Sequence, residues 1–244
     1  MSPSSASCIE ANGLVRKFGK TEVLHGITMT IRQGEIFGLL GPSGAGKTTL
    51  VKLIAGIEEA TSGQVTVLGT RIPRLEMMRR IGYMAQSDAL YTDLTAWENL
   101  EFFGALFGLR GQKLKQRIGE TMELVGLSDA LHRLVGAYSG GMKRRLSLAI
   151  ALLHEPEVLI LDEPTVGIDP VLRKSIWEAF NKLSRSGMTI VITTHVMDEA
   201  DRCDRLGMIQ DGRLIALGAP ADLINETGSR TLEEAFLYYG GVRP

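Results

Sequence analysis

The first part of the chain carries short apolar runs that alternate with polar positions, as half-buried strands do. Residues 9–15 and 23–31 show this alternation, and Gly19 and Gly34 mark the turns that follow them. Further strands are expected at residues 36–40, 63–68 and 81–84, with one helix at about 47–55. The pattern therefore predicts a mainly β region that contains a single helix.

A helical pattern replaces the strand pattern between residues 92 and 153. Apolar side chains recur three or four positions apart, at Leu94, Trp97, Leu100, Phe103 and Leu106. Aromatic residues crowd the segment 102–107, and we assign most of them to the core of this helical region. The region is expected to be an insert between strands.

Continuous apolar runs return in the last third of the chain. Residues 158–161 and 189–193 have the composition of strands buried on both faces, and a helix over 170–186 would supply a right-handed crossover between them. Shorter strands at 206–210 and 214–217, joined by Asp211 and Gly212, precede an amphipathic helix at 232–239. Alternating strands and helices of this kind predict an α/β fold.

Composition and charge narrow the functional classes. The 244 residues are 44% hydrophobic and 23% charged, with a formal net charge of −1, which gives no electrostatic reason to expect a nucleic-acid partner. No apolar run is long enough to cross a bilayer, and the opening residues do not resemble a secretory signal. Cys8 and Cys203 are isolated and have no metal-site spacing, so both are expected to be reduced thiols in the cytosol.

A phosphate-binding pattern, G-x-x-x-x-G-K-[ST], follows the strand at 36–40 directly. It consists of Gly41, Pro42, Ser43, Gly44, Ala45, Gly46, Lys47 and Thr48, with Thr49 next. Glycines let backbone N–H groups point at phosphate oxygens, and the following helix turns its positive end toward them. Lys47 would reach the β- and γ-phosphates and Thr48 would ligate Mg²⁺. The strand-loop-helix setting favours nucleoside triphosphate binding over a chance match.

Two carboxylates, Asp162 and Glu163, end the apolar run at 158–161. A buried strand would deliver Asp162 to the carboxyl edge of the sheet, where it could hold Mg²⁺ opposite Thr48. Glu163, one step on, could polarise the attacking water. The alternative is an ordinary acidic turn, which would be about as good an explanation without the phosphate loop upstream.

A second segment whose backbone N–H groups could bind phosphate stands at the start of a basic helix. It consists of Ser139, Gly140, Gly141 and Met142. Serine is also a favoured N-cap, so a plain helix start is the alternative. Because the first phosphate site is already complete, a second one suggests that two copies of the chain share one nucleotide.

With these motifs in order, the chain resembles the nucleotide-binding subunit of an ATP-binding cassette (ABC) transporter over residues 8–240. The resemblance matches Phe18 to the adenine-stacking aromatic, Gln86 to the Q-loop, residues 139–142 to the signature, Asp169 to the D-loop and His195 to the switch histidine. It implies a P-loop NTPase core with a mostly parallel sheet, an antiparallel β subdomain and an inserted α-helical subdomain. We therefore treat 1–244 as one domain, with a disordered lead at 1–8, a core at 9–87 and 157–223, a helical subdomain at 88–156 and a C-terminal helix at 224–244.

The signature departs from the usual Leu-Ser-Gly-Gly-Gln, because Tyr138 and Met142 stand at its ends. This variant, with the segments 194–200 and 231–236, is similar to the branch that serves drug and polysaccharide exporters. The resemblance thus implies export of a small molecule, lipid or polysaccharide and leaves the transported molecule open.

The resemblance also implies a mechanism and partners. Two cassettes would dock head to tail and enclose ATP, with residues 139–142 reaching the partner's nucleotide. Glu163 would act as general base, His195 would contact the γ-phosphate, and Lys47, Gln86 and Mg²⁺ would hold the nucleotide. His195 could instead be a plain strand-end cap, which its position in the family order disfavours; the other histidines are expected to be structural.

A transmembrane permease subunit would hold the chain at the cytoplasmic face of the membrane, and Leu90, Tyr91 and Leu94 would help to form its docking groove. A homodimer needs no second gene, but a heterodimer stays possible. The functional alternatives are a soluble ABC ATPase, such as a cluster-assembly ATPase, and a nucleotide binder without turnover.

Overall fold

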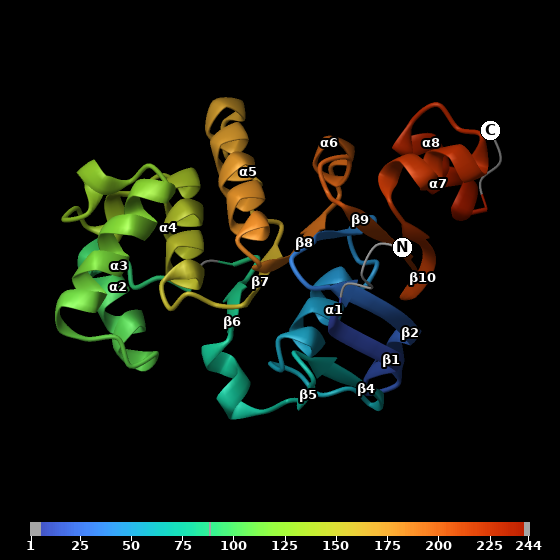
Figure 1. Cartoon of the computed structure of the whole chain (residues 1–244), viewed down its shortest axis with the longest axis horizontal. Helices are drawn as coiled ribbons and strands as arrows, with labels where there is room; N and C mark the ends of the chain where they lie inside the picture. The colour runs from blue at the N-terminus through green and yellow to red at the C-terminus, as the bar shows by residue number, and fades with distance from the viewer. Residues whose placement is uncertain (1–5, 88, 242–244) are drawn as a thin grey trace.

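Two β-sheets and a set of helices make up the computed structural model, which describes residues 6–87 and 89–241 (Figure 1). The larger sheet has the strand order β10-β9-β3-β8-β7-β6. Its strands are β3 (Ile36–Leu40), β6 (Ile81–Met84), β7 (Val158–Asp162), β8 (Thr189–Thr194), β9 (Arg205–Gln210) and β10 (Arg213–Gly218). All neighbours pair in parallel except β9 and β10. The expected, mostly parallel sheet is confirmed.

The smaller sheet is antiparallel, with the order β2-β1-β4-β5. Its strands are β1 (Ser7–Phe18), β2 (Thr21–Arg32), β4 (Ser62–Val67) and β5 (Thr70–Ile72). The helix α1 (Lys47–Ile54) packs against strands of both sheets. The phosphate loop therefore lies where the two layers meet.

Helices occupy both ends of the molecule (Figure 1). Beyond β6 lie α2 (Ala96–Leu106), α3 (Gly111–Leu124) and α4 (Gly140–Leu152), and beyond β10 lie α7 (Pro220–Thr227) and α8 (Leu232–Tyr239). The helix α5 (Pro170–Arg185) connects β7 to β8, as expected, and the short α6 (Met197–Ala200) follows β8. Three 3₁₀ turns complete the described elements, at Leu75–Arg79, Ser128–Ala130 and Val135–Ala137.

The strands that lead to the expected site are buried throughout. Every residue of β3, β7 and β8 is buried, as their continuous apolar sequences predicted. On one side of the sheet α5 contributes Trp177 and Phe180 to the core, and on the other α1 contributes Leu50 and Val51. This burial fixes the carboxyl ends of the strands, which carry the candidate chemistry.

Two expected boundaries are wrong. The lead was expected to reach residue 8, but β1 begins at Ser7, which pairs with Arg32 of β2, and the next residue, Cys8, is buried; residues 1–5 of that lead lie outside the described part. The C-terminal helix was expected to begin at 224, but α7 begins at Pro220 and ends at Thr227, with Gly228 as its C-cap at a φ of 67°; α8 then follows at the predicted residues 232–239. Glycine adopts this left-handed conformation without strain, which breaks the tail into two helices.

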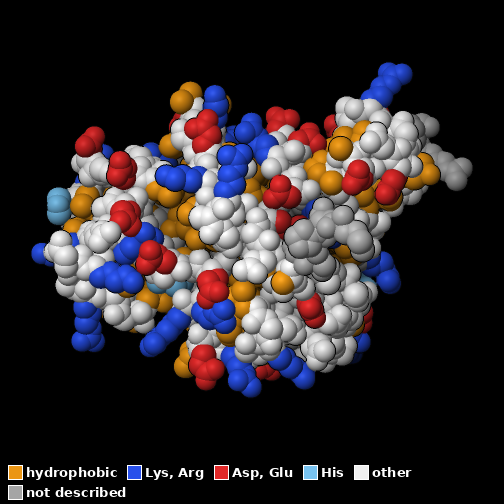
Figure 2. Space-filling view, in the orientation of Figure 1, with side chains coloured by type: hydrophobic (Ala, Val, Ile, Leu, Met, Phe, Trp, Pro, Cys, Tyr) orange, Lys and Arg blue, Asp and Glu red, His pale blue; other side chains and the backbone are white. Residues whose placement is uncertain are grey.

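The surface carries both signs of charge on the face shown in Figure 2, with no single-sign field. Hydrophobic side chains gather on that face near α4 and α5 and around α7 and α8. In the described ranges, no helix has both the length and the apolar sequence needed to cross a bilayer.

The aromatic cluster at 102–107 is less buried than expected, because Phe102 and Leu106 are exposed and Phe103 and Phe107 only half-buried.

Candidate functional site

The loop between β3 and α1 favours glycine at several positions, either because φ is positive or because space is short. Gly44 and Gly46 have φ values of 80° and 100°, which favour glycine. A Cβ on Gly41 would lie 2.2 Å from the carbonyl oxygen of Ile209 in β9. Gly46 is the N-cap of α1 and provides no side-chain cap, so the first N–H groups of the helix are left for an anion.

Lys47, the first residue of α1, folds back onto this loop. Its buried ammonium donates to the carbonyl oxygens of Gly41 at 2.7 Å and Pro42 at 2.9 Å. Burial lowers the pKa of Lys47, and the charges of Glu163 and Asp162 partly oppose that shift. Two neutral carbonyls thus hold the charge, where a phosphate would be a stronger partner.

Asp162 ends β7 as a buried carboxylate whose acceptors are only partly used. Thr193, its partner in the register with β8, donates to Asp162 Oδ1 at 2.5 Å. Within the described residues, Asp162 Oδ2 is buried and has no hydrogen-bond partner. Leaving a buried carboxylate oxygen unsatisfied is costly, so this atom fits an ordered water or a cation.

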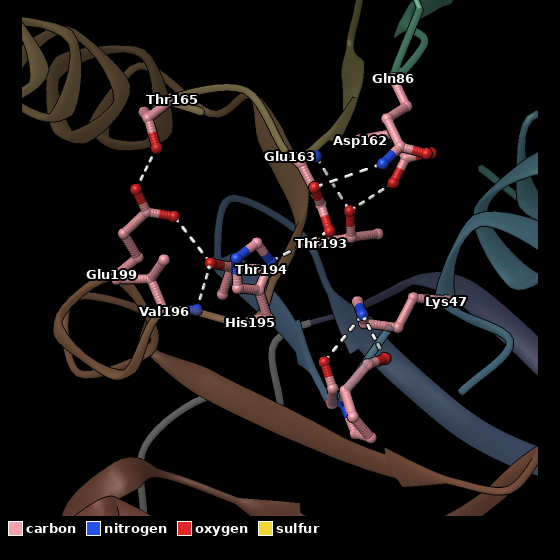
Figure 3. A network of polar contacts seen from close by, with 12 residues as sticks. Lys47, Gln86, Asp162, Glu163, Thr165, Thr193, Thr194, His195, Val196 and Glu199 are labelled. Carbon is pink, nitrogen blue, oxygen red and sulfur yellow. Dashed lines mark hydrogen bonds and ion pairs between the residues drawn. The ribbon is translucent and has the colours of Figure 1, made fainter. Parts of the chain in front are cut away.

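Glu163 is the point at which three of the expected residues meet (Figure 3). Its Oε1 lies 3.2 Å from His195 Nδ1, a hydrogen bond when that nitrogen carries the proton, and its Oε2 accepts from Gln86 Nε2 at 3.4 Å. Glu163 itself has a φ of 51°, an uncommon value for a residue with a side chain. Its N–H donates to the carbonyl oxygen and hydroxyl of Thr193, and these bonds help to hold the strained turn.

A cavity of about 290 Å³ joins the phosphate loop to this carboxylate. It is lined by Val23, Ser43, Gly44, Gly46, Lys47, Thr48, Thr49, Gln86 and Glu163. Most of the expected nucleotide-binding residues therefore face one space. For the described part of the chain, this lining does not include Phe18 or the segment 139–142.

Phe18 lies apart, at the turn between β1 and β2, with 45% of its surface exposed. The guanidinium of Arg16 lies 4.4 Å from the centre of the Phe18 ring. Arg16 is held in turn by the Glu58 carboxylate at 3.3 Å and the Glu59 carbonyl at 2.8 Å. This cation–π contact orders the exposed ring, which remains available as an apolar surface.

The signature and D-loop residues begin helices in the structure. Ser139 caps α4, its Oγ accepting from the Met142 N–H at 3.3 Å, and Asp169 caps α5 by accepting from the Leu172 N–H at 3.0 Å. The capping alternative that was stated for Ser139 is therefore observed, and Asp169 caps a helix as well. Capping and a role toward a partner's nucleotide are compatible, and the second role stays a prediction.

One of the basic residues that follow the segment 139–142, which no motif singled out, connects these loops. Arg144 in α4 is buried, and its guanidinium donates to four backbone carbonyls: Ala85 at 2.6 Å, Gln86 at 2.9 Å, Glu163 at 2.8 Å, and Asp162. The arginine thus ties the signature helix to the loops that carry Gln86 and Glu163.

The donor set suits Mg²⁺. The unsatisfied Asp162 oxygen, the Thr48 hydroxyl and the Gln86 amide oxygen are hard oxygen ligands of the kind that Mg²⁺ prefers. In the described ranges no three His, Cys, Asp or Glu side chains cluster as a metal site.

Comparisons with known proteins agree with this geometry. A family model described as "ABC transporter" matches residues 24–166. The probable multidrug ABC transporter ATP-binding protein YbhF of Escherichia coli (strain K12) is 42% identical over 236 residues, which are 94% of this chain and 41% of that protein. The Nod factor export ATP-binding protein I of Rhizobium sp. (strain N33) is 43% identical over 225 residues, 91% of this chain and 74% of that protein.

A solved structure described as the ATP binding subunit of an ABC transporter superposes with a TM-score of 0.88 and 28% identity, covering 96% of this chain and 100% of that one. This chain thus spans less than half the length of YbhF but about three quarters of the Nod factor export protein.

Proposed function

This chain belongs to the ABC transporter family, and on that premise we propose that it is an ATPase that powers export through a separate membrane subunit. The similarity to proteins named for multidrug transport and Nod factor export favours an exporter over a soluble cluster-assembly ATPase. The transported molecule would be a small molecule, lipid or polysaccharide selected by the membrane subunit.

One observation carries the proposal of ATP hydrolysis. The phosphate loop, with Lys47, lines the same cavity as Glu163 and Gln86, and His195 contacts Glu163 from the other side. A nucleotide whose phosphates occupy the loop would bring its γ-phosphate toward Glu163. A simple nucleotide binder would not need this carboxylate–histidine pair, so the arrangement favours turnover.

Each residue has a definite task in the proposed reaction. Lys47 would exchange its two carbonyl partners for phosphate oxygens, with the N–H groups of residues 43–49 around it. Glu163 would accept a proton from the attacking water or orient that water, and His195 would contact the γ-phosphate and steady Glu163. Phe18 would stack on the adenine.

Thr48, Gln86 and Asp162 would hold Mg²⁺, which neutralises phosphate charge when it is bound. Thr193 would keep Asp162 oriented through the bond to Oδ1, which leaves Oδ2 free for the ion or its water.

Two cassettes would complete each site, because the segment 139–142 does not line the cavity of its own chain. We propose that Ser139, Gly140 and Gly141 contact the γ-phosphate bound by a second copy, with Met142 and Asp169 nearby. ATP would then close the dimer and hydrolysis would open it. The intact set of residues allows a homodimer.

A permease would hold the dimer at the cytoplasmic face of the membrane, docked near Gln86. Leu90 and Leu94 are half-buried and Tyr91 is exposed, so these side chains offer an apolar surface next to that residue. The helix that would occupy this surface belongs to the membrane subunit.

ATP-dependent dimerisation of Glu163→Gln tests the proposal, because this variant should bind ATP without hydrolysing it. We expect a monomer that becomes a dimer in gel filtration only with Mg-ATP, and a fall in phosphate release of about 10²- to 10⁴-fold. Glu123→Gln, which changes an exposed carboxylate on α3, is the control and should behave like the wild type.

The outcomes separate the parts of the proposal. Binding of ATP without dimerisation would point to a heterodimer or to a membrane subunit that is needed for closure. A wild-type chain that does not bind ATP would contradict the whole assignment.

A further inference from the structure

A second buried carboxylate lies behind the site, and nothing in the proposed reaction uses it. Glu199 in α6 is only 4% exposed. Its Oε1 accepts from the Thr165 hydroxyl and its Oε2 accepts from the Thr194 hydroxyl at 2.7 Å (Figure 3). Among the described residues, no ion pair to Glu199 is formed. Both of its oxygens are thus held by neutral hydroxyls.

The two threonines belong to the two loops that matter for hydrolysis. Thr165 lies between Glu163 and Asp169, in the turn that follows β7. Thr194 ends β8, directly before His195, and its hydroxyl also accepts from the Val196 N–H at 3.0 Å. Glu199 therefore bridges the loop before α5 to the loop that carries His195.

Stability is a poor explanation for such a bridge. Removing a carboxylate from water is costly, and buried polar groups can often be replaced together by apolar groups of similar shape without loss of stability. The three side chains are all buried, with Thr165 and Thr194 each 2% exposed, so apolar packing was available at all three positions. What the carboxylate adds is a fixed geometry between two loops.

We propose that Glu199 is a positioning residue that makes the loop with Asp169 and the loop with His195 move as one unit. The proposal rests on the proposed function, in which Asp169 lies near the second cassette. When the two cassettes close, the loop at residues 164–169 would move. The hydrogen bonds from Thr165 and Thr194 to Glu199 would make the loop with His195 move with it. His195 would then reach its working position only in the closed dimer.

The bridge should therefore affect turnover and leave nucleotide binding unchanged. Lys47 and the phosphate loop are not among the residues bonded to Glu199 in the described structure. Losing the bridge would let His195 shift relative to Glu163, and a displacement of about 1 Å at a reacting group can lower a rate about 10²-fold.

The decisive variant replaces all three partners with apolar residues: Glu199→Leu, Thr165→Val and Thr194→Val. No hydroxyl or carboxylate is left unsatisfied, and only the Val196 N–H loses its side-chain acceptor, so the protein should still fold, with a slightly lower melting temperature than the wild type. We expect kcat to fall by about 10- to 100-fold while the affinity for Mg-ATP changes less than about twofold. Glu199→Gln keeps a polar bridge and should recover part of the lost kcat.

Glu35→Gln is the matched control, since Glu35 is also buried but lies at the opposite end of the sheet and bonds to Arg205. It should leave kcat unchanged. A wild-type kcat in the folded triple variant would overturn the proposal, and so would a parallel loss of ATP affinity. Failure of the wild type itself to hydrolyse ATP, alone or with its membrane subunit, would instead refute the proposed function.

Discussion

At the scale of single residues, burying the charged side chain of Lys47 does not stabilise the fold. Burial lowers its pKa, and its two carbonyl partners are neutral. Replacing it in Lys47→Met should leave the free energy of unfolding unchanged or raise it, because a desolvated charge is removed. ATP affinity should fall by about 10- to 100-fold, as charge-assisted bonds of about 1.5–3 kcal/mol are lost. Urea unfolding and equilibrium ATP binding measure the two effects.

The same shift gives a pH dependence with a defined sign. The folded chain disfavours charged Lys47, so its penalty to stability is present below the lowered pKa and disappears as the pH rises toward the ordinary lysine pKa of 10.5. ATP affinity should weaken over the same rise, because the neutral amine binds phosphate poorly. Lys47→Met should lack this component, and an identical pH profile in both proteins would contradict it.

The two thiols should be inert in the folded protein. Burial raises the pKa of Cys8 and of Cys203, and these side chains are 3% and 5% exposed. Since the thiolate is the reactive form, a disulfide reagent at pH 8 should label neither thiol in the native chain and both after denaturation. Cys8→Ala should reduce the denatured count to one. Rapid labelling of the native protein would contradict this prediction.

At the scale of elements, two helix caps separate stability from function. Ser139 caps α4, and Thr95 caps α2 by accepting from the Glu98 N–H at 3.2 Å. Ser139→Ala and Thr95→Ala should each cost about 1 kcal/mol of stability. Only Ser139→Ala should also weaken ATP-dependent dimerisation, measured in the Glu163→Gln background. Equal dimerisation of the two variants would remove the proposed phosphate contact of Ser139.

The elements that the sequence predicted are those whose local signals agree with tertiary packing. The runs that became β7 and β8 were recognisable because every residue in them is apolar or packs inside. The hairpin of β9 and β10 was recognisable from Asp211 and Gly212, both with positive φ as a two-residue turn needs. The three-residue strand β5 and the four-residue helix α6 were missed. Segments this short cannot show a periodic pattern of apolar and polar residues.

The candidate site was predictable where chemistry follows order along the chain, and not where it depends on three-dimensional contacts. The phosphate loop and Glu163 could be found from motif and context. Arg144 was hidden in a basic run, although helical spacing puts it on the same face as the buried Leu148 and Ala151, which is a usable signal. The bridge made by Glu199 had no signal in the sequence, because Thr165 lies 34 residues away and is brought to Glu199 only by the fold.

At the scale of the whole molecule, the proposed docking surface follows Gln86 in the sequence and includes Tyr91. Tyr91 and Phe102 are 48% and 41% exposed and meet edge to face, with ring centres 5.0 Å apart. Beneath them the fully buried Asn99 accepts from the Tyr91 N–H at 2.9 Å and donates to its carbonyl at 3.0 Å. The backbone of Tyr91 is thus fixed before any partner arrives, which lowers the entropic cost of docking.

Docking of the membrane subunit should therefore depend on Tyr91 more than on aromatic exposure in general. Tyr91→Ser should strongly reduce co-purification with that subunit, since a rigid exposed aromatic can contribute about 2 kcal/mol or more at an interface. ATP binding by the isolated chain should not change. Tyr238→Ser removes an aromatic that is 50% exposed on α8, at the other end of the molecule (Figure 1), and should leave co-purification intact. If Tyr238→Ser alone releases the membrane subunit, the permease docks on the C-terminal helices and not beside Gln86.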